Sequence, residues 1–242
     1  MTASDASPTE AERETVQGDL LIGSYNLWKN NASHELERLV EDHRLDVLCL
    51  QEADSAKLPP AIGPLHRSAA TERNRLGLAI YHRADEFEMI DSSIFTLPKS
   101  FHDHLMSPGE DRLLAVRLRD PRDGNELVVA SFHAAPLTTV NSARRRQIKL
   151  AHGFLAEWAP ELPMVMVGDY NYPWFRQGLA KRIVRSGHEI TFSDSHTYRR
   201  YRYIRGHFDF VTSLKVRIES VASLPKGASD HMPILVRASV AV

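Results

Sequence analysis

Side chains able to bind a metal ion or to move a proton recur at the ends of short apolar runs in this sequence. Most of them directly follow such a run, Asp209 lies between two phenylalanines inside one, and Asp230 and His231 precede the last one. Strand ends that open into loops are where α/β sheets collect their ligands. We therefore expect one shared site built from Asn26, Glu52, His133, Asp169, Asn171, Asp209, Asp230 and His231.

The residue types in this set suit hydrolysis at phosphorus. Carboxylate and amide oxygens are the ligands that a hard cation such as Mg²⁺ takes, together with phosphate and water. Phosphoryl transfer also needs a positioned water molecule and neutralisation of the charge on the equatorial oxygens. Histidine, with an unperturbed pKa of about 6.5, can serve as acid or base near neutral pH.

The elements that must carry these residues are short strands alternating with a few helices. Apolar, often β-branched runs predict strands, and several are apolar on both faces, as in Met164–Val167. Helices are expected from Ser33 as N-cap, over 141–158, and over 175–186 before Gly187. No linker or repeat divides residues 20–242, which predicts one α/β domain. The strands are expected at 20–26, 46–51, 76–82, 113–118, 127–132, 163–168, 208–213, 215–222 and 234–239.

Six short blocks around these residues carry a family resemblance. They are SYN (24–26), LQE (50–52), SFHAAP (131–136), GDYN (168–171), FDF (208–210) and SDHMP (229–233). In this order and over nearly the whole body, they resemble the endonuclease/exonuclease/phosphatase superfamily, whose fold is that of deoxyribonuclease I. The resemblance implies a four-layer α/β sandwich, in which two packed, mainly antiparallel β-sheets are flanked by helices.

The resemblance also implies roles for single residues. Glu52 resembles the principal Mg²⁺ ligand, with Asn26 beside it and Asp230 as a further carboxylate on the metal side. Asp169 and Asn171 resemble the pair that holds the phosphate and the attacking water. His231 resembles the histidine that activates water or stabilises the phosphorane-like charge, and Asp209 its orienting carboxylate. His133 resembles the histidine that binds the phosphate or the leaving group.

Each of these residues alone also has a purely structural interpretation. Asn26, Asp169 and Asn171 are common turn residues, and Glu52 suits a helix start. Asp209 is harder to explain in that way, because an acid between two phenylalanines in a strand needs a partner. If His231 must be neutral to accept a proton, activity should fall on the acid side of its pKa. A flat profile from pH 5 to 8 would instead leave it as a charged stabiliser.

Three arginines are candidate contacts for the substrate phosphate: Arg144, Arg199 and Arg202. Arg144 lies near the start of the helix that follows His133, where a solvent-exposed helix face is the alternative. The other two belong to the Arg/Tyr stretch 198–205, which suits phosphate contacts and base stacking but also a solvated edge strand. The aromatic segment 172–175 is typical either of a substrate pocket or of a helix cap, and the sequence does not separate these.

Charge and composition limit the setting of this chemistry. Residues 1–19 carry five acidic side chains and one basic one, which leaves +3 on the rest of a 242-residue chain whose formal net charge is −1. We interpret them as a disordered acidic leader, because they lack the basic start and apolar core of a secretory signal. The single cysteine, Cys49, excludes an intrachain disulfide. A cytoplasmic location fits, and no apolar run is long enough to span a membrane.

The sequence therefore predicts a hydrolase of phosphoester bonds that depends on Mg²⁺ or Mn²⁺. We expect a nuclease-like phosphodiesterase with nucleic acid as the favoured substrate and a water molecule assisted by His231 and Asp209. The alternatives are a phosphatase or sphingomyelinase-like enzyme acting on a small or lipid substrate, and a catalytically silent binding module of the same fold. The motifs of zinc peptidases, P-loop enzymes and α/β-hydrolases are absent from the sequence.

Overall fold

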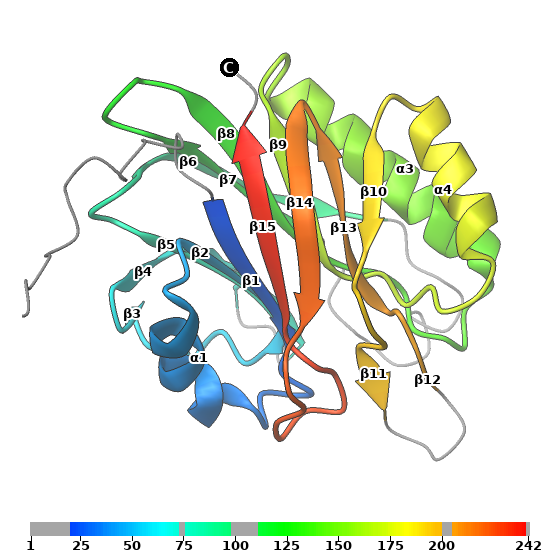
Figure 1. Ribbon diagram of the computed structural model, residues 1–242, viewed down its shortest axis with the longest axis horizontal. Helices are drawn as coiled ribbons and strands as arrows, with labels where there is room; N and C mark the ends of the chain where they lie inside the picture. The colour runs from blue at the N-terminus through cyan, green and yellow to red at the C-terminus, as the bar shows by residue number, and fades with distance from the viewer. Residues whose placement is uncertain (1–19, 73–75, 98–110, 200–204, 241–242) are drawn as a thin grey trace, which may run out of the picture.

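Two β-sheets packed face to face form the centre of the molecule, with helices on their outer faces (Figure 1). The computed structural model describes residues 20–72, 76–97, 111–199 and 205–240. Within these ranges the first sheet has seven strands in the order β14-β15-β1-β2-β5-β4-β3. Their bounds are Val216–Ser223, Ile234–Val240, Leu20–Asn26, Val47–Ala53, Gly77–Arg83, Leu65–Ala70 and Ala61–Ile62, in that order.

The second sheet has six described strands in the order β10-β13-β9-β8-β7-β6. A separate hairpin of two short strands, β11 (Tyr198–Arg199) and β12 (Arg205–Gly206), lies at its lower end in Figure 1. The bounds of the six strands are Glu189–Phe192, Asp209–Leu214, Met164–Asp169, Glu126–His133, Asp111–Arg119 and Glu88–Thr96, in the order of the sheet.

Each sheet contains one parallel pair of strands joined by a helix. In the first sheet β1 and β2 are parallel and are linked through a short 3₁₀ turn, Ser33–Glu35, and helix α1 (Leu36–His43). In the second, β8 and β9 are parallel and are linked through helix α3 (Asn141–Trp158). All other strand pairs between named strands are antiparallel. The two βαβ units place the carboxyl ends of four strands at one end of the sandwich.

Three apolar clusters lie between successive layers of the sandwich. The central cluster joins the inner faces of the two sheets and includes Ile22, Cys49, Val116 and Val167. A second cluster packs α3 and helix α4 (Arg176–Arg185) on the outer face of the second sheet. The third packs α1 on the outer face of the first sheet. Helix, sheet, sheet and helix thus form four layers, as the resemblance implied.

The predicted elements agree with the structure except at a few positions. All nine predicted strands form, and the helix over 141–158 has the predicted bounds. Ser33 does not cap α1: it opens the 3₁₀ turn, Glu35 precedes the helix, and the Ser33 hydroxyl accepts a hydrogen bond from Asn30. Six of the described strands were not predicted, because they are short or lack a buried apolar run. They are β3, β4, β6, β10, β11 and β12.

Two further expectations concerned the acidic leader and the lack of a membrane-spanning segment. The acidic leader, residues 1–19, lies outside the described residues. Of the helices in the described ranges, none combines the length and the apolar character that crossing a bilayer requires.

Candidate functional site

The predicted site residues meet at the lower end of the sandwich in Figure 1, where the carboxyl ends of β1, β2, β8 and β9 lie. Asn26, His133 and Asp169 are the last residues of β1, β8 and β9, and Glu52 is the last but one of β2. Register pairs Asp209, the first residue of β13, with Asp169 on the neighbouring strand. His231 enters from the loop before β15, so residues from six segments come together.

One carboxylate oxygen, Oδ2 of Asp169, lies at the centre of this arrangement. It accepts hydrogen bonds from the side-chain amides of Asn26 and Asn171, each at 3.0 Å. The Nε2 atoms of His231 and His133 lie 3.6 and 3.7 Å from it. We call these five residues the Asp169 cluster. Four nitrogen groups directed at one anionic oxygen form the kind of environment that a phosphoryl oxygen requires.

His231 is held by a second carboxylate on its other side. Its Nδ1 atom lies 2.8 Å from Oδ2 of Asp209, and both side chains are almost completely buried. Burial disfavours the imidazolium ion, but the carboxylates of Asp209 and Asp169 outweigh this and raise the pKa of His231 to about 10. The histidine therefore carries a proton at neutral pH.

The other two titratable groups of the cluster respond mainly to burial. Burial raises the pKa of Asp169 to about 7, Asp209 and Glu52 act in the same direction, and the positive charge of His231 opposes them. Burial, together with the positive charges of Arg112 and His231, lowers the pKa of His133 to about 3. Asp169 thus titrates near neutral pH, while His133 is neutral there.

The backbone around Asp169 explains the residue types of the block 168–171. Gly168 has a φ of 147°, and a Cβ at this position would lie 2.0 Å from the carbonyl oxygen of Phe132. Only glycine allows the strand to approach β8 this closely. Asn171 adopts a left-handed conformation with φ 49°, which asparagine tolerates, and its N–H bonds to Oδ1 of Asp169 at 2.8 Å. The turn therefore aims both side chains into the cluster.

Glu52 and Asn26 are oriented by an unusual turn of the main chain. Trp28, Lys29 and Asn30 all have positive φ, between 47° and 68°. The N–H of Trp28 donates to Oδ1 of Asn26 at 3.0 Å, and the N–H of Lys29 donates to Oε2 of Glu52 at 3.1 Å. Three consecutive non-glycine residues in this region are strained. The strained turn thus directs two backbone N–H groups at the side chains of Asn26 and Glu52 and orients them.

These two residues offer oxygen ligands that fit a hard divalent cation. The Glu52 side chain is 21% exposed, and its Oε1 atom lies 3.9 Å from Nε2 of His133. Asp230 is buried, and its neighbour Ser229 donates a hydrogen bond to the carbonyl oxygen of Asn26 at 2.7 Å. Such an oxygen set, with a carboxylate reachable from solvent, is what Mg²⁺ prefers.

A second potential ligand set consists of Asp169, Asp209 and His231, whose ligand atoms lie within 4.8 Å of one another. Hydrogen bonding already explains this proximity. Nδ1 of His231 is engaged by Asp209, and both amides described above donate to Asp169. We therefore favour the Glu52 side of the site for a metal ion.

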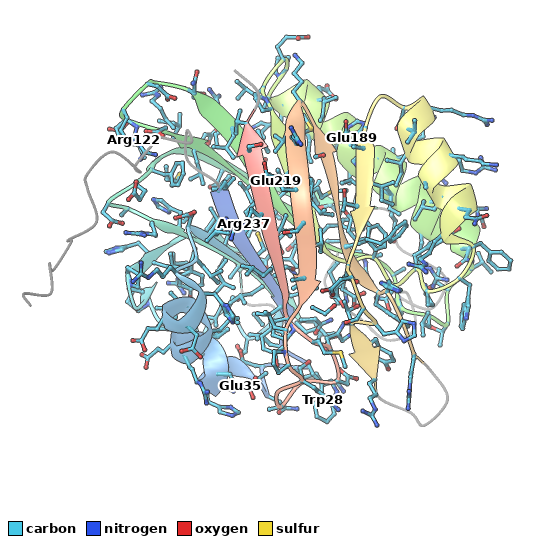
Figure 2. The ribbon with its side chains drawn as sticks, viewed as in Figure 1. Trp28, Glu35, Arg122, Glu189, Glu219 and Arg237 are labelled. Atoms are coloured by element: carbon cyan, nitrogen blue, oxygen red, sulfur yellow. The ribbon has the colours of Figure 1, made fainter. Side chains whose placement is uncertain are left out.

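Several supporting residues were not predicted from the sequence. Oγ1 of Thr197, a fully buried residue, accepts hydrogen bonds from the N–H groups of Phe208 and Asp209 at 3.0 Å. Glu35 accepts bonds from the Tyr25 hydroxyl at 2.8 Å and from the N–H of Ala228 at 2.7 Å, which fastens the loop that carries His231. Figure 2 shows Glu35 and Trp28 at this same end of the molecule. Neither Thr197 nor Glu35 lies in one of the six sequence blocks, so nothing in the sequence marks it as part of the site.

The three arginines proposed for phosphate binding differ in their positions. Arg144 is buried, donates to the carbonyl oxygen of Pro136 at 2.8 Å and also contacts Asn141. Arg199 is exposed, and its backbone N–H bonds to the carbonyl oxygen of Asp230 at 2.9 Å. Arg202 lies outside the described residues. The structure thus brings the backbone of Arg199 next to the loop of His231 and holds Arg144 in contacts within the protein.

Comparison with known proteins adds independent evidence. A sequence model described as "Endonuclease/Exonuclease/phosphatase family" matches residues 23–231. No curated protein sequence gives a match.

Several solved structures share the fold. A mannosyl-6-phosphatase of Bacteroides thetaiotaomicron is 16% identical with a TM-score of 0.72, covering 91% of this chain and 99% of its own. TDP2 of D. rerio, complexed with a single-strand DNA product, is 17% identical with a TM-score of 0.73, covering 92% and 100%. The catalytic domain of human Nocturnin, with bound sulfate, is 16% identical with a TM-score of 0.69, covering 92% and 95%.

Proposed function

The chain belongs to the endonuclease/exonuclease/phosphatase family and is a hydrolase of that family, and from this premise we propose that it is a divalent-metal-dependent phosphodiesterase that cleaves nucleic acid. The observation that carries the proposal is the Asp169 cluster, where two amides and two imidazoles surround one buried carboxylate oxygen. A binding module would have no need of this arrangement, because buried ionisable groups cost stability and such perturbed groups cluster at sites that carry out chemistry.

The residues divide the reaction between them. Asp169 has a pKa near neutral pH and lies beside Asn171, so it can orient the attacking water molecule and accept its proton. His231, kept protonated by Asp209, neutralises the charge that develops on the phosphoryl oxygens. This supports the charged-stabiliser role of His231 over that of a neutral base. His133, which is neutral, can donate one hydrogen bond to the leaving-group oxygen.

A metal ion would be held by Glu52 and Asn26, with Asp230 nearby. When bound, Mg²⁺ or Mn²⁺ supplies positive charge to the phosphate and to the attacking water. Enzymes of this family generally use divalent metals. In this chain the Glu52 side chain is 21% exposed, so a hydrated ion can approach it.

Nucleic acid is the favoured substrate for two reasons. The hairpin β11–β12 carries Arg199 and Arg205 next to the loop of His231, where they can contact phosphates. Among the structural neighbours, TDP2 holds a single-strand DNA product and ANGEL2 is described as a 2',3'-cyclic phosphatase bound to adenosine-2',3'-vanadate. The mannosyl-6-phosphatase neighbour makes a sugar phosphate the main alternative.

A substrate panel with Mg²⁺ or Mn²⁺ tests the proposal. It contains single-stranded DNA, RNA, duplex DNA, a sugar phosphate, sphingomyelin and a chromogenic phosphodiester. We expect cleavage of nucleic acid, with loss of turnover in both Glu52→Gln and His231→Ala. Faster hydrolysis of the sugar phosphate or of sphingomyelin would show that this compound, and not nucleic acid, represents the substrate class. No turnover on any substrate, with no Mg²⁺-induced thermal shift, would favour a silent binding module.

A further inference from the structure

Two adjacent aromatic side chains project into solvent three and four residues after Asn171. Trp174 is 51% exposed and Phe175 is 76% exposed. Single exposed apolar residues are ordinary, but two consecutive large exposed aromatic residues are not. Because a chain advances at most about 3.6 Å per residue, the Cα atom of Trp174 lies within about 11 Å of that of Asn171. Both residues therefore belong to the segment that directly leaves the Asp169 cluster at Asn171.

Phe175 is held in this position at a cost to the fold. Its backbone is left-handed, with φ 60° and ψ 32°, a conformation that is rare for a bulky residue. Its carbonyl oxygen accepts the N–H groups of Gly178 and Leu179, so the backbone does cap α4. The ring takes no part in this capping, and its exposure means that little burial offsets the strain. Strain without a packing benefit is typical of functional positions.

The segment that carries the two rings is fastened on both sides. Tyr172 is buried, and its hydroxyl accepts a hydrogen bond from Arg145 at 3.0 Å. Pro173 lies so close to Gly206 that a Cβ there would be 2.7 Å from the proline Cβ. Arg176 places its guanidinium 4.9 Å from the centre of the Phe192 ring. These anchors hold the backbone around the exposed pair, which limits the entropy lost when a ligand binds.

The hairpin β11–β12 lies between the segment 172–176 and the loop that carries His231. On one side Tyr198 forms a β-bridge with His231, and on the other Gly206 meets Pro173. Figure 1 shows the hairpin at the lower end of the molecule, on the side of α4. The exposed Arg205 of the hairpin and Arg176 of α4 add positive charge along the same strip. Aromatic rings next to cations are the features with which proteins bind single-stranded nucleic acid.

We propose that Trp174 and Phe175 form a platform on which a nucleobase of a single-stranded nucleic acid stacks, next to the phosphate held at the Asp169 cluster. This inference rests on the proposed function and explains which form of nucleic acid the enzyme prefers. Only a base released from a duplex presents its face to such a platform, so single strands are the preferred form. Sequence preference is low, because every base has an aromatic face.

The test compares two single-stranded oligonucleotides with the same number of phosphates, one with bases and one with abasic sites throughout. The double variant Trp174→Ala/Phe175→Ala should lower kcat/KM for the first about 5- to 150-fold and leave the abasic one unchanged. Val184→Ala, which truncates an exposed apolar residue within α4, serves as the matched control and should change neither. Equal losses on both oligonucleotides, or none on either, would overturn the platform.

Binding measured without turnover separates this inference from the proposed function. Fluorescence anisotropy of labelled oligonucleotides without metal should show a weaker Kd for the double variant only when bases are present. If no phosphodiester is cleaved, the proposed function fails, and this binding comparison still decides the platform. Tighter binding of duplex than of single strand would contradict the single-strand preference. Unchanged thermal melting of the variants confirms that they fold.

Discussion

The two βαβ units of the molecule have the same order of elements but place their terminal side chains in different surroundings. In the first unit, β1-α1-β2, the two strands carry Asn26 and Glu52 at their carboxyl ends. In the second unit, β8-α3-β9, the two strands carry His133 and Asp169 there. The Glu52 side chain is 21% exposed, whereas that of Asp169 is 2% exposed. One architecture therefore presents one carboxylate to solvent and buries the other.

The difference shows how burial divides chemistry between similar positions. A carboxylate reachable from solvent suits a hydrated cation, while a buried one has its pKa raised towards neutral pH and can exchange a proton. The first unit orients its side chains by the strained turn 28–30, and the second by glycine at position 168. The predictions below test whether the two units differ in function as well as in environment.

Asp169→Asn should give the largest effect, a loss of about 10²- to 10⁴-fold in kcat, because it removes the group that we propose accepts the proton. Stability at pH 8 should be unchanged or higher, because the buried carboxylate, whose pKa is raised to about 7, is replaced by a neutral isostere. Steady-state kinetics and thermal melting measure the two. Asp91→Asn, on the outer strand β6, is a control that should change neither.

Glu52→Gln should act through the metal ion and therefore differ from Asp169→Asn. We expect Mn²⁺ binding by calorimetry to weaken at least about tenfold, with activity partly restored at high metal concentration. Asp169→Asn should retain more of the metal affinity. An unchanged Mn²⁺ affinity in Glu52→Gln would place the metal elsewhere.

The second unit also buries a histidine in its outer layer, which predicts a loss of stability in acid. Burial and the stacked His188 lower the pKa of His152 to about 3. The unfolded chain takes up this proton below pH 6.5 and the folded chain does not, so stability falls as the pH falls from 6.5 towards 3, by up to about 1.4 kcal/mol per pH unit. Urea unfolding of His152→Gln should show a shallower acid slope, and an identical slope would refute the assignment.

The smallest effect is expected in the first unit. Lys29 is exposed and left-handed, with φ 56°, so Lys29→Gly should stabilise the fold by about 1 kcal/mol. Lys29→Ala keeps the Cβ and should show no such gain. Destabilisation by glycine relative to alanine would mean that the turn is not strained.

Much of the fold and of the candidate site could be predicted from the sequence, because a polar residue after an apolar run marks the end of a strand. The strands that carry the site are apolar on both faces, and polar residues such as Asn26 and Asp169 mark where they end. The strand β6, at the edge of the described part of its sheet, has no such pattern, because its side chains are exposed or only partly buried.

Other features left no pattern to detect. The turn 28–30 is built of tryptophan, lysine and asparagine, none of which signals a left-handed backbone as glycine does. Within the run Arg144–Arg146, nothing shows that Arg144 is the buried member. Thr197 acts through hydrogen bonds to Phe208 and to Asp209 at the start of β13, 11 and 12 residues away, which only the tertiary structure creates.

The most direct test of the account is metal-dependent cleavage of a single-stranded oligonucleotide by the wild-type chain and by Asp169→Asn, at equal concentration and with both proteins shown to be folded by thermal melting. The account predicts Mg²⁺- or Mn²⁺-dependent hydrolysis by the wild-type chain and a loss of at least about 10²-fold in the variant. Equal cleavage by the two proteins would contradict the role of the Asp169 cluster.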